Sequence, residues 1–243
     1  MAIAGRWLAG LALVLGLACG AAALLAGPAY RIELLPLGAA IQTVRWAATF
    51  ALAGGVLAVV GALLMWTDKV ARGLALALAA LAINLLVATP PLLLYRQVRL
   101  LPPIHDISTD TDHPPQFVAV VALRQGAPNP VDYRHDVAAT QKKGYPDIEP
   151  LLLALTPPQT FERAERVARA MGWVVVAVAP QDLRIEATDT TLLFGFKDDV
   201  VIRVTALGQG SRVDVRSLSR VGESDLGVNA GRIRAFMAKL SQH

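Results

Sequence analysis

The sequence predicts a membrane-anchored α+β protein, with three transmembrane helices followed by an antiparallel four-stranded sheet flanked by two helices. Hydrophobic residues make up 54% of the 243 residues, above the roughly 45–50% typical of soluble domains. Almost all of this excess lies before residue 100. Four strand-like runs and two amphipathic helical runs lie beyond that point. These observations separate a membrane domain, residues 1–99, from an exported α+β domain, residues 100–243.

The membrane domain contains three apolar runs, at about residues 7–26, 46–66 and 73–94. Each is close to the roughly 20 residues that a helix needs to cross a bilayer. Aromatic side chains favour the headgroup level of a membrane, and they mark the ends of these runs at Trp7, Trp46, Trp66 and Tyr95. The pattern therefore predicts three transmembrane helices.

The third run holds the polar and helix-breaking residues of this region, Asn84 and the pair Pro90–Pro91. We expect Asn84 to hydrogen-bond to a neighbouring helix. The prolines are expected to end or bend the helix near the interface. No Asp, Glu, Lys, Arg or His lies inside the three predicted spans, which argues against a transport path.

The charge distribution bears on partners and orientation. Residues up to 96 hold six basic and two acidic residues, which leaves 17 of each in the remainder of the chain. A neutral domain lacks the basic footprint of a nucleic-acid-binding protein, so no nucleic-acid partner is expected.

The cations that flank the predicted spans, such as Lys69, do not decide the orientation of the chain in the membrane. Arg6 before the first apolar run resembles an export signal, which favours a bacterial inner-membrane protein with its C-terminal domain in the periplasm.

Two amphipathic helices are predicted in the C-terminal domain. The first follows Thr156, where a proline at the first helical position and Gln159 complete a capping box, and it stops at Gly172. The second is indicated by apolar residues at helical spacing between Leu226 and Leu240. Ser224 or Asp225 is expected to cap its start.

Four strands are predicted between these helices, in residues 173–179, 183–194, 199–207 and 211–219. Short turns separate them, which favours an antiparallel meander with both helices on one sheet face. Upstream, "FVAVVAL" is predicted to be a short strand or a docking segment. Residues 127–150 are rich in turn formers and are expected to form a long surface loop.

The segment "IHDISTDTDHPPQFVAV" gathers candidate metal ligands: His105, Asp106, Asp110, Asp112 and His113. They show no helical pair of histidines, and the calcium-loop pattern lacks its glycine and its final glutamate. Asp, Ser and Thr side chains commonly bond to nearby backbone groups. We therefore expect local ordering here, and neither a metal nor another cofactor.

Alternating polar residues mark one face of the predicted sheet, namely Arg184, Glu186, Thr188, Arg212, Asp214 and Arg216. The simpler interpretation is a solvated face with cross-strand ion pairs. The alternative is a face that binds a partner or a polar ligand.

A third candidate lies before the last helix, in Arg216, Ser219, Arg220, Ser224 and Asp225. A helix N-terminus favours an anion, so these residues predict a possible site for phosphate or an anionic lipid headgroup. Helix capping and an arginine–carboxylate pair, with Asp225 or Glu186 as the partner of Arg220, explain the same residues without a ligand. Both interpretations stay open.

Three segments resemble the domain of unknown function 1499 (DUF1499) family: "IHDISTDTDHPPQF", "IEATDTTLLFGFKDDVVIRV" and "GSRVDVRSLSRVGESDLGVNAGRI". The resemblance covers roughly residues 100–240. It implies an envelope or lumenal domain and no established activity. The positions within these motifs to which it assigns no role are His105, Asp106, Asp110, Glu186, Asp189 and Thr190.

The sequence contains no serine-hydrolase elbow, phosphate-binding loop or HExxH motif. We therefore expect a non-catalytic envelope protein that binds a protein partner or an anionic component, for example as an accessory subunit of a membrane complex. The alternative is a periplasmic hydrolase that uses His105 or His113 with Asp106 or Asp189.

Overall fold

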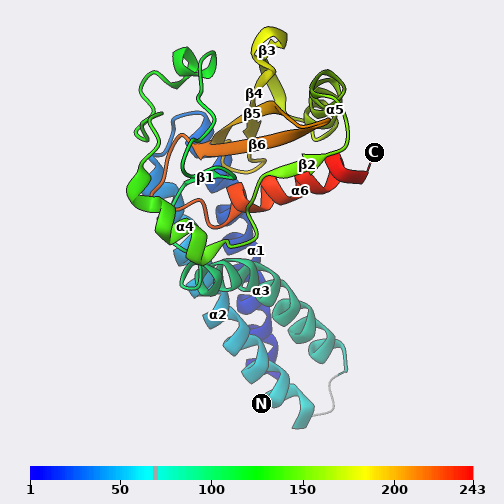
Figure 1. Cartoon of the computed structure of the whole chain (residues 1–243). Coiled ribbons are helices and arrows are strands. Elements are labelled where there is room, and N and C mark those ends of the chain that lie inside the picture. The colour runs from blue at the N-terminus through cyan, green and yellow to red at the C-terminus, as the bar shows by residue number, and fades with distance from the viewer. Residues whose placement is uncertain (68–70, 243) are drawn as a thin grey trace. The chain divides into compact units, whose positions relative to one another are not determined.

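The computed structural model describes residues 1–67 and 71–242 (Figure 1). Lys69, one of the flanking cations, lies outside the described residues. The chain forms two compact units, the first of residues 1–97 with 192–195 and the second of residues 98–191 with 196–243. Each unit has its own packing.

The first unit contains the helices α1 (Ala2–Arg31), α2 (Leu37–Thr67) and α3 (Ala71–Val98). All three are long and apolar enough to cross a membrane, so the prediction of three such helices is confirmed. Of the two alternatives for Pro90–Pro91, an end of the third helix is wrong, because α3 continues through both prolines to Val98, and a bend stays a prediction. Each proline leaves one backbone carbonyl without its usual donor, a loss that membrane helices tolerate where neighbouring helices, Ser or Thr side chains or local 3-10 turns satisfy that carbonyl.

Asn84 lies at the centre of this bundle and is 1% exposed. Its Nδ2 donates to the carbonyl oxygen of Ala12 on α1 at 2.9 Å and to that of Ala80 at 2.8 Å, which confirms the predicted interhelical bond. Two glycines make room for the amide. A Cβ at Gly16 would lie 2.8 Å from Nδ2, and a Cβ at Gly54 would overlap Oδ1.

The second unit is built on an antiparallel sheet of six strands instead of the four predicted (Figure 1). The four predicted strands are present as β3 (Val174–Ala179), β4 (Arg184–Thr190), β5 (Lys197–Leu207) and β6 (Gly210–Ser219). The additional strands are β1 (Asp106–Ser108) and β2 (Leu151–Leu153), and both pair with β6. The main order is β1-β6-β5-β4-β3. The two extra strands are three residues long, too short to show an alternating pattern.

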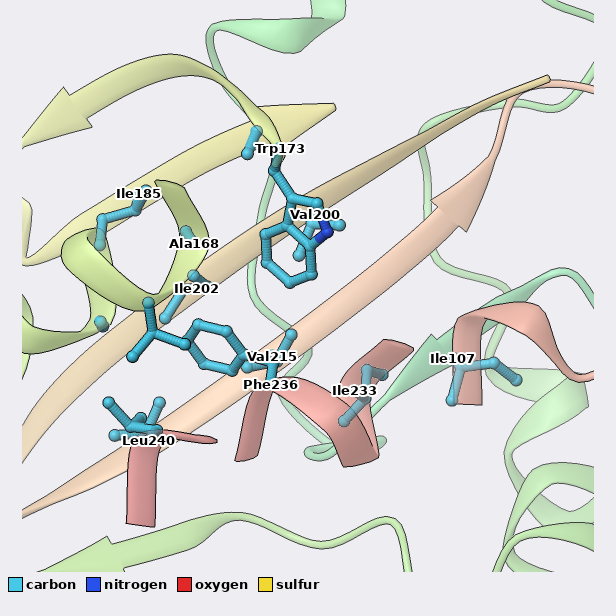
Figure 2. Packing of buried hydrophobic residues seen from close by; sticks show 14 of the residues in the cluster. Ile107, Ala168, Trp173, Ile185, Val200, Ile202, Val215, Ile233, Phe236 and Leu240 are labelled. Atoms are coloured by element: carbon cyan, nitrogen blue, oxygen red, sulfur yellow. The ribbon is translucent and has the colours of Figure 1, made fainter. Parts of the chain in front are cut away.

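Helices α5 (Pro157–Ala170) and α6 (Val228–Gln242) pack against one face of this sheet. Figure 2 shows the core, where the rings of Trp173 and Phe236 stack with centroids 5.5 Å apart, beside Ile185, Ile202 and Val215 from three strands. The capping box of Thr156 and Gln159 is formed, as predicted.

The segments between these elements differ from the expectations. The "FVAVVAL" segment is not a strand, and a 3-10 helix, η1, spans Val120–Arg124. The expected long loop contains a 3-10 turn, η2 (His135–Val137), and the short helix α4 (Ala138–Gly144). A third turn, η3 (Pro180–Asp182), joins β3 to β4.

Strand β3 pairs with β4 alone and ends the strand order on that side. Its register shifts between Val175 and Ala177, which marks an irregularity of the β-bulge kind.

Candidate functional site

The sheet face opposite α5 and α6 carries charged residues. We call it the polar face, and its members are Arg184, Glu186, Thr188, Asp199, Arg203, Arg212, Asp214 and Arg216. The prediction of one shared face is correct, but the expectation that it is solvated is wrong. Residues 109–134, here called the cover segment, lie over it and contact it through Phe117, Val120 and Arg124. Four charged residues of the face are fully buried: Glu186, Asp199, Asp214 and Arg216.

Arg216 is the fully buried cation of this face. Its Nε and Nη2 donate to the two carboxylate oxygens of Asp106 at 2.9 and 2.8 Å, a bidentate pair. Nη2 also donates to the carbonyl oxygen of Val131 at 2.7 Å. The guanidinium lies 5.0 Å from the ring centre of Phe117 and 5.3 Å from that of Tyr133, within cation–π range. Arg216 therefore joins β6, β1 and the cover segment.

Asp199 is the centre of a second buried cluster. Its carboxylate accepts hydrogen bonds from Arg220 Nη2 at 2.8 Å, from Arg124 Nη1 at 2.5 Å and from Thr188 Oγ1 at 2.7 Å. Burial raises the pKa of Asp199, but the hydrogen bonds from Arg220, Thr188 and Arg124 outweigh burial and hold the pKa below its usual range. The carboxylate thus stays ionised where it pairs with two guanidinium groups.

Glu186 explains why η1 is not a strand. Its carboxylate accepts the backbone N–H of Val118 and that of Val120, each at 3.0 Å. Arg184 Nε donates to the same carboxylate at 3.0 Å. A side chain on β4 therefore takes the donors that a strand ladder would have used.

Asp110 and Asp214 bind two arginines together. Arg203 Nη2 and Arg212 Nη2 each donate to Asp110 Oδ2 at 3.0 Å, and both also reach Asp214. Asp110 Oδ1 accepts the backbone N–H of His113 at 2.8 Å, which is the local ordering that the sequence predicts. Among the described residues no group of three or more His, Cys, Asp or Glu could hold a metal ion.

Asp189 lies on the helix-covered side of the sheet, whereas Thr190 lies at the end of β4. Arg232 on α6 donates to Asp189 at 2.9 Å and to Asp198 at 2.7 Å, and it also contacts Asn229. Thr190 is exposed at the end of β4. Asp189 and Asp106 therefore lie in different ionic clusters, because Asp189 pairs with Arg232 and Asp106 pairs with Arg216.

The segment before α6 caps the helix. Asp225 Oδ2 accepts the backbone N–H of Asn229, in the first turn of α6, at 2.6 Å, so of the two predicted caps the structure has Asp225. Ser224 Oγ accepts the N–H of Leu226 at 3.2 Å, which is outside the helix. Leu226 itself precedes the helix, with a φ of 56°. Burial raises the pKa of Asp225 despite these bonds. Ser219 Oγ accepts from Asn229 Nδ2 at 3.0 Å.

These contacts bear on the predicted anion site. Arg220 pairs with Asp199, and not with Asp225 or Glu186, the two partners that the sequence suggested. Arg216 pairs with Asp106. Both guanidinium groups are engaged inside the fold, which supports the interpretation without a ligand. The anion site stays a prediction.

A cavity of about 370 Å³ opens beside Asp106. Its charged and imidazole lining residues are His105, Asp106, Asp132, Arg134 and Glu223, and its apolar walls are Pro103, Ile104, Pro130 and Val137. His105 Nδ1 donates to the carbonyl oxygen of Glu223 at 3.1 Å. The lining contains no Ser, Thr or Cys among the residues that the structure describes.

The outer surface of the cover segment is apolar around η1. Val118, Val121 and Leu123 are 57%, 42% and 53% exposed, and we call them the cover patch. The buried neighbours Phe117, Val120 and Arg124 hold this segment against the sheet. The cover patch is therefore a group of exposed aliphatic side chains on a segment that its buried neighbours hold in place.

Sequence reasoning missed several residues of these clusters, above all Arg124, Asp198, Asp199 and Arg232. Arg124 follows an apolar run, and Asp198 and Asp199 follow a turn, so each reads as an ordinary surface charge. The sequence offered no local signal for their pairing, because Arg124 and Asp199 lie 75 positions apart and Arg232 and Asp198 lie 34 apart.

A search of curated proteins finds no match to this chain. A family model described as "Protein of unknown function (DUF1499)" matches residues 106–240. This range contains β1, the cover segment, the whole polar face and nearly all of α6, and it is more than half of the chain. It also agrees with the resemblance of the three sequence segments. The chain therefore belongs to the DUF1499 family.

Proposed function

We propose that this protein is a membrane-anchored, non-catalytic binding protein of the cell envelope, whose C-terminal domain holds a protein partner as an accessory subunit of a membrane complex. The cover patch is the observation that carries this proposal. Exposed aliphatic residues on a well-supported segment are typical of protein–protein contact sites.

A protein partner is favoured over an anionic one by the charges nearby. Residues 111–128 contain a single Lys or Arg, which is Arg124, and it is buried and bound to Asp199. Surfaces that bind anionic lipids use exposed cations and aromatic residues. The partner of the cover patch is accordingly an apolar surface with little charge.

The hydrolase alternative gains no support from the cavity. A Ser–His or Cys–His mechanism requires a nucleophile within hydrogen-bond reach of the imidazole, and the described lining beside His105 offers none. Asp189 is held by Arg232. The hydrolase hypothesis stays a prediction.

We place the N-terminus inside and the C-terminal domain outside the inner membrane, in the periplasm, on the basis of Arg6 and three candidate spans. A reporter that is active only outside the cytoplasm, fused to the C-terminus, should be active. Activity of a cytoplasm-only reporter at the same point would contradict this placement.

The partner is tested with the tagged full chain, purified from membranes in mild detergent. A specific partner should co-purify with the wild type and be lost from Val121→Glu and Leu123→Glu, because a carboxylate at the patch would be desolvated without a counter-charge. Leu152→Glu on β2 is the matched control, since Leu152 is 61% exposed and lies outside the patch.

The purified chain and the purified partner should form a stoichiometric complex when mixed. Val121→Glu and Leu123→Glu should prevent this complex, and Leu152→Glu should not. A partner retained equally by all three variants would contradict the proposal. If the full chain bound protein-free lipid vesicles and Leu123→Glu abolished that binding, the cover patch would contact a membrane and not a protein partner.

A further inference from the structure

We propose that the cavity beside Asp106 binds a small aliphatic amine through its ammonium groups. This site is separate from the cover patch, and the inference does not depend on the partner proposed above. It rests on the size of the cavity, its surplus of hydrogen-bond acceptors and its unpaired negative charge.

The cavity fits a small molecule with a short apolar stem. Its volume of about 370 Å³ lies near the lower end of the range for ligand pockets. Pro103, Ile104, Pro130 and Val137 supply apolar walls, which methylene groups can contact. Prolines at two of these positions restrict the backbone and so help to keep the walls in place.

Apart from Arg134, whose Nε and Nη2 donate to Asp136, the polar groups at the wall are acceptors. Arg216 uses one lone-pair position on each oxygen of Asp106, and a carboxylate offers about four. A carbonyl oxygen only accepts, so the contact of His105 with the carbonyl of Glu223 places the ring proton on Nδ1. In the neutral ring Nε2 is then an acceptor as well. A ligand must therefore bring donors.

The charges at the wall call for a cation. The bidentate partners Asp106 and Arg216 neutralise each other, and Arg134 is paired with Asp136. The carboxylates of Asp132 and Glu223 have no ion-pair or hydrogen-bond partner among the described residues. Two negative charges remain, which a molecule with two ammonium groups would neutralise.

A primary ammonium group satisfies these conditions better than a metal ion. The described residues contain no cluster of three or more groups that could hold a metal, whereas an ammonium needs single acceptors in several directions. The aliphatic walls favour a ligand with methylene groups over a bare ion. A short diamine has this chemistry in full, and an amine-bearing lipid headgroup supplies one of the two ammonium groups.

The probe is 1,4-diaminobutane, titrated by calorimetry into the full chain in nanodiscs of phosphatidylcholine. We expect saturable binding that weakens with salt, because exposed charges are screened. Butan-1-ol and butyrate, which lack the ammonium, should not bind. Nanodiscs that contain phosphatidylethanolamine distinguish the source, since a lipid headgroup ligand would compete with the free amine.

The variants Asp132→Asn and Glu223→Gln each remove one unpaired carboxylate and keep the size of the side chain. Each should weaken diamine binding about two- to fivefold, the equivalent of one exposed ion pair. Both positions are exposed, so melting temperatures should stay near that of the wild type. Glu149→Gln, an exposed carboxylate outside the cavity, is the matched control and should bind like the wild type. No binding by the wild type, or equal loss in the control, would overturn the proposal.

Discussion

Arg216→Met should lower the free energy of unfolding of the C-terminal domain by about 3–5 kcal/mol, the usual cost of breaking a buried ion pair. The substitution leaves the carboxylate of Asp106, whose side chain is 8% exposed, without its bidentate partner. It also removes the donor to the carbonyl oxygen of Val131. Three acceptors, the carboxylate of Asp106 and the carbonyl oxygens of Pro115 and Val131, thus lose hydrogen bonds, and the cover segment loses one of its contacts with β6.

Chemical denaturation of the full chain in detergent, followed by tryptophan fluorescence, measures this loss, because Trp173 lies in the domain core. Limited proteolysis should show new cleavage within residues 109–134. Arg212→Met is the matched control, since Arg212 is 35% exposed and should cost far less.

The double variant Asp106→Leu/Arg216→Met tests whether the loss of stability comes from the unpaired carboxylate or from lost packing. Because it leaves no unpaired carboxylate, it should recover much of the stability lost in Arg216→Met. A single variant as stable as the wild type would show that the pair contributes little to the fold.

Gly54→Ala should disrupt the three-helix bundle, because the new Cβ would overlap Oδ1 of Asn84. Overpacking of this kind costs about 1–3 kcal/mol, and displacing the amide would also break its bonds to Ala12 and Ala80. A peptide carbonyl in hydrocarbon finds no water as a replacement partner. The measurement is thermal or SDS-induced loss of helicity of the full chain.

Two comparisons make this second result specific. Gly10→Ala adds the same methyl group where nothing lies within 4 Å, so its stability should equal that of the wild type. Asn84→Ala in the Gly54→Ala background removes the obstacle and should restore part of the lost stability. If both glycine variants melted like the wild type, the close approach at Gly54 would be refuted.

Periodicity and capping predicted the long elements of this fold. The apolar runs indicated α1 to α3, and the capping box of Thr156 and Gln159 located the start of α5. The alternating runs indicated β3 to β6. These signals are local, because each is produced by residues within one or two turns or strand repeats.

The cover segment could not be predicted because long-range contacts determine it. Glu186 takes the backbone N–H groups of Val118 and Val120, 68 and 66 residues away in the chain. Intrinsic preference favoured a strand there, and a distant carboxylate overrode that preference. The same holds for β1, whose three residues become a strand only by pairing with β6.

Some residues of the candidate site were predicted from the sequence, but their arrangement was not. Asp106 and Arg216 were both singled out, yet the pair spans 110 positions. In one of the two open interpretations Arg220 would pair with Asp225 or Glu186, and in the structure it pairs with Asp199. A single sequence reports residue types and local spacing, and the pairing of charges across a buried face requires the sheet register.

The register shift in β3 has a consequence for solubility. An outermost strand exposes unpaired N–H and C=O groups, to which a strand of another molecule can bind, and such pairing begins aggregation. The shift between Val175 and Ala177 interrupts the even spacing that an incoming strand would need, although Val174 beside it is 65% exposed. We therefore expect the register shift to oppose pairing of the valine-rich strand β3 with a strand of another molecule.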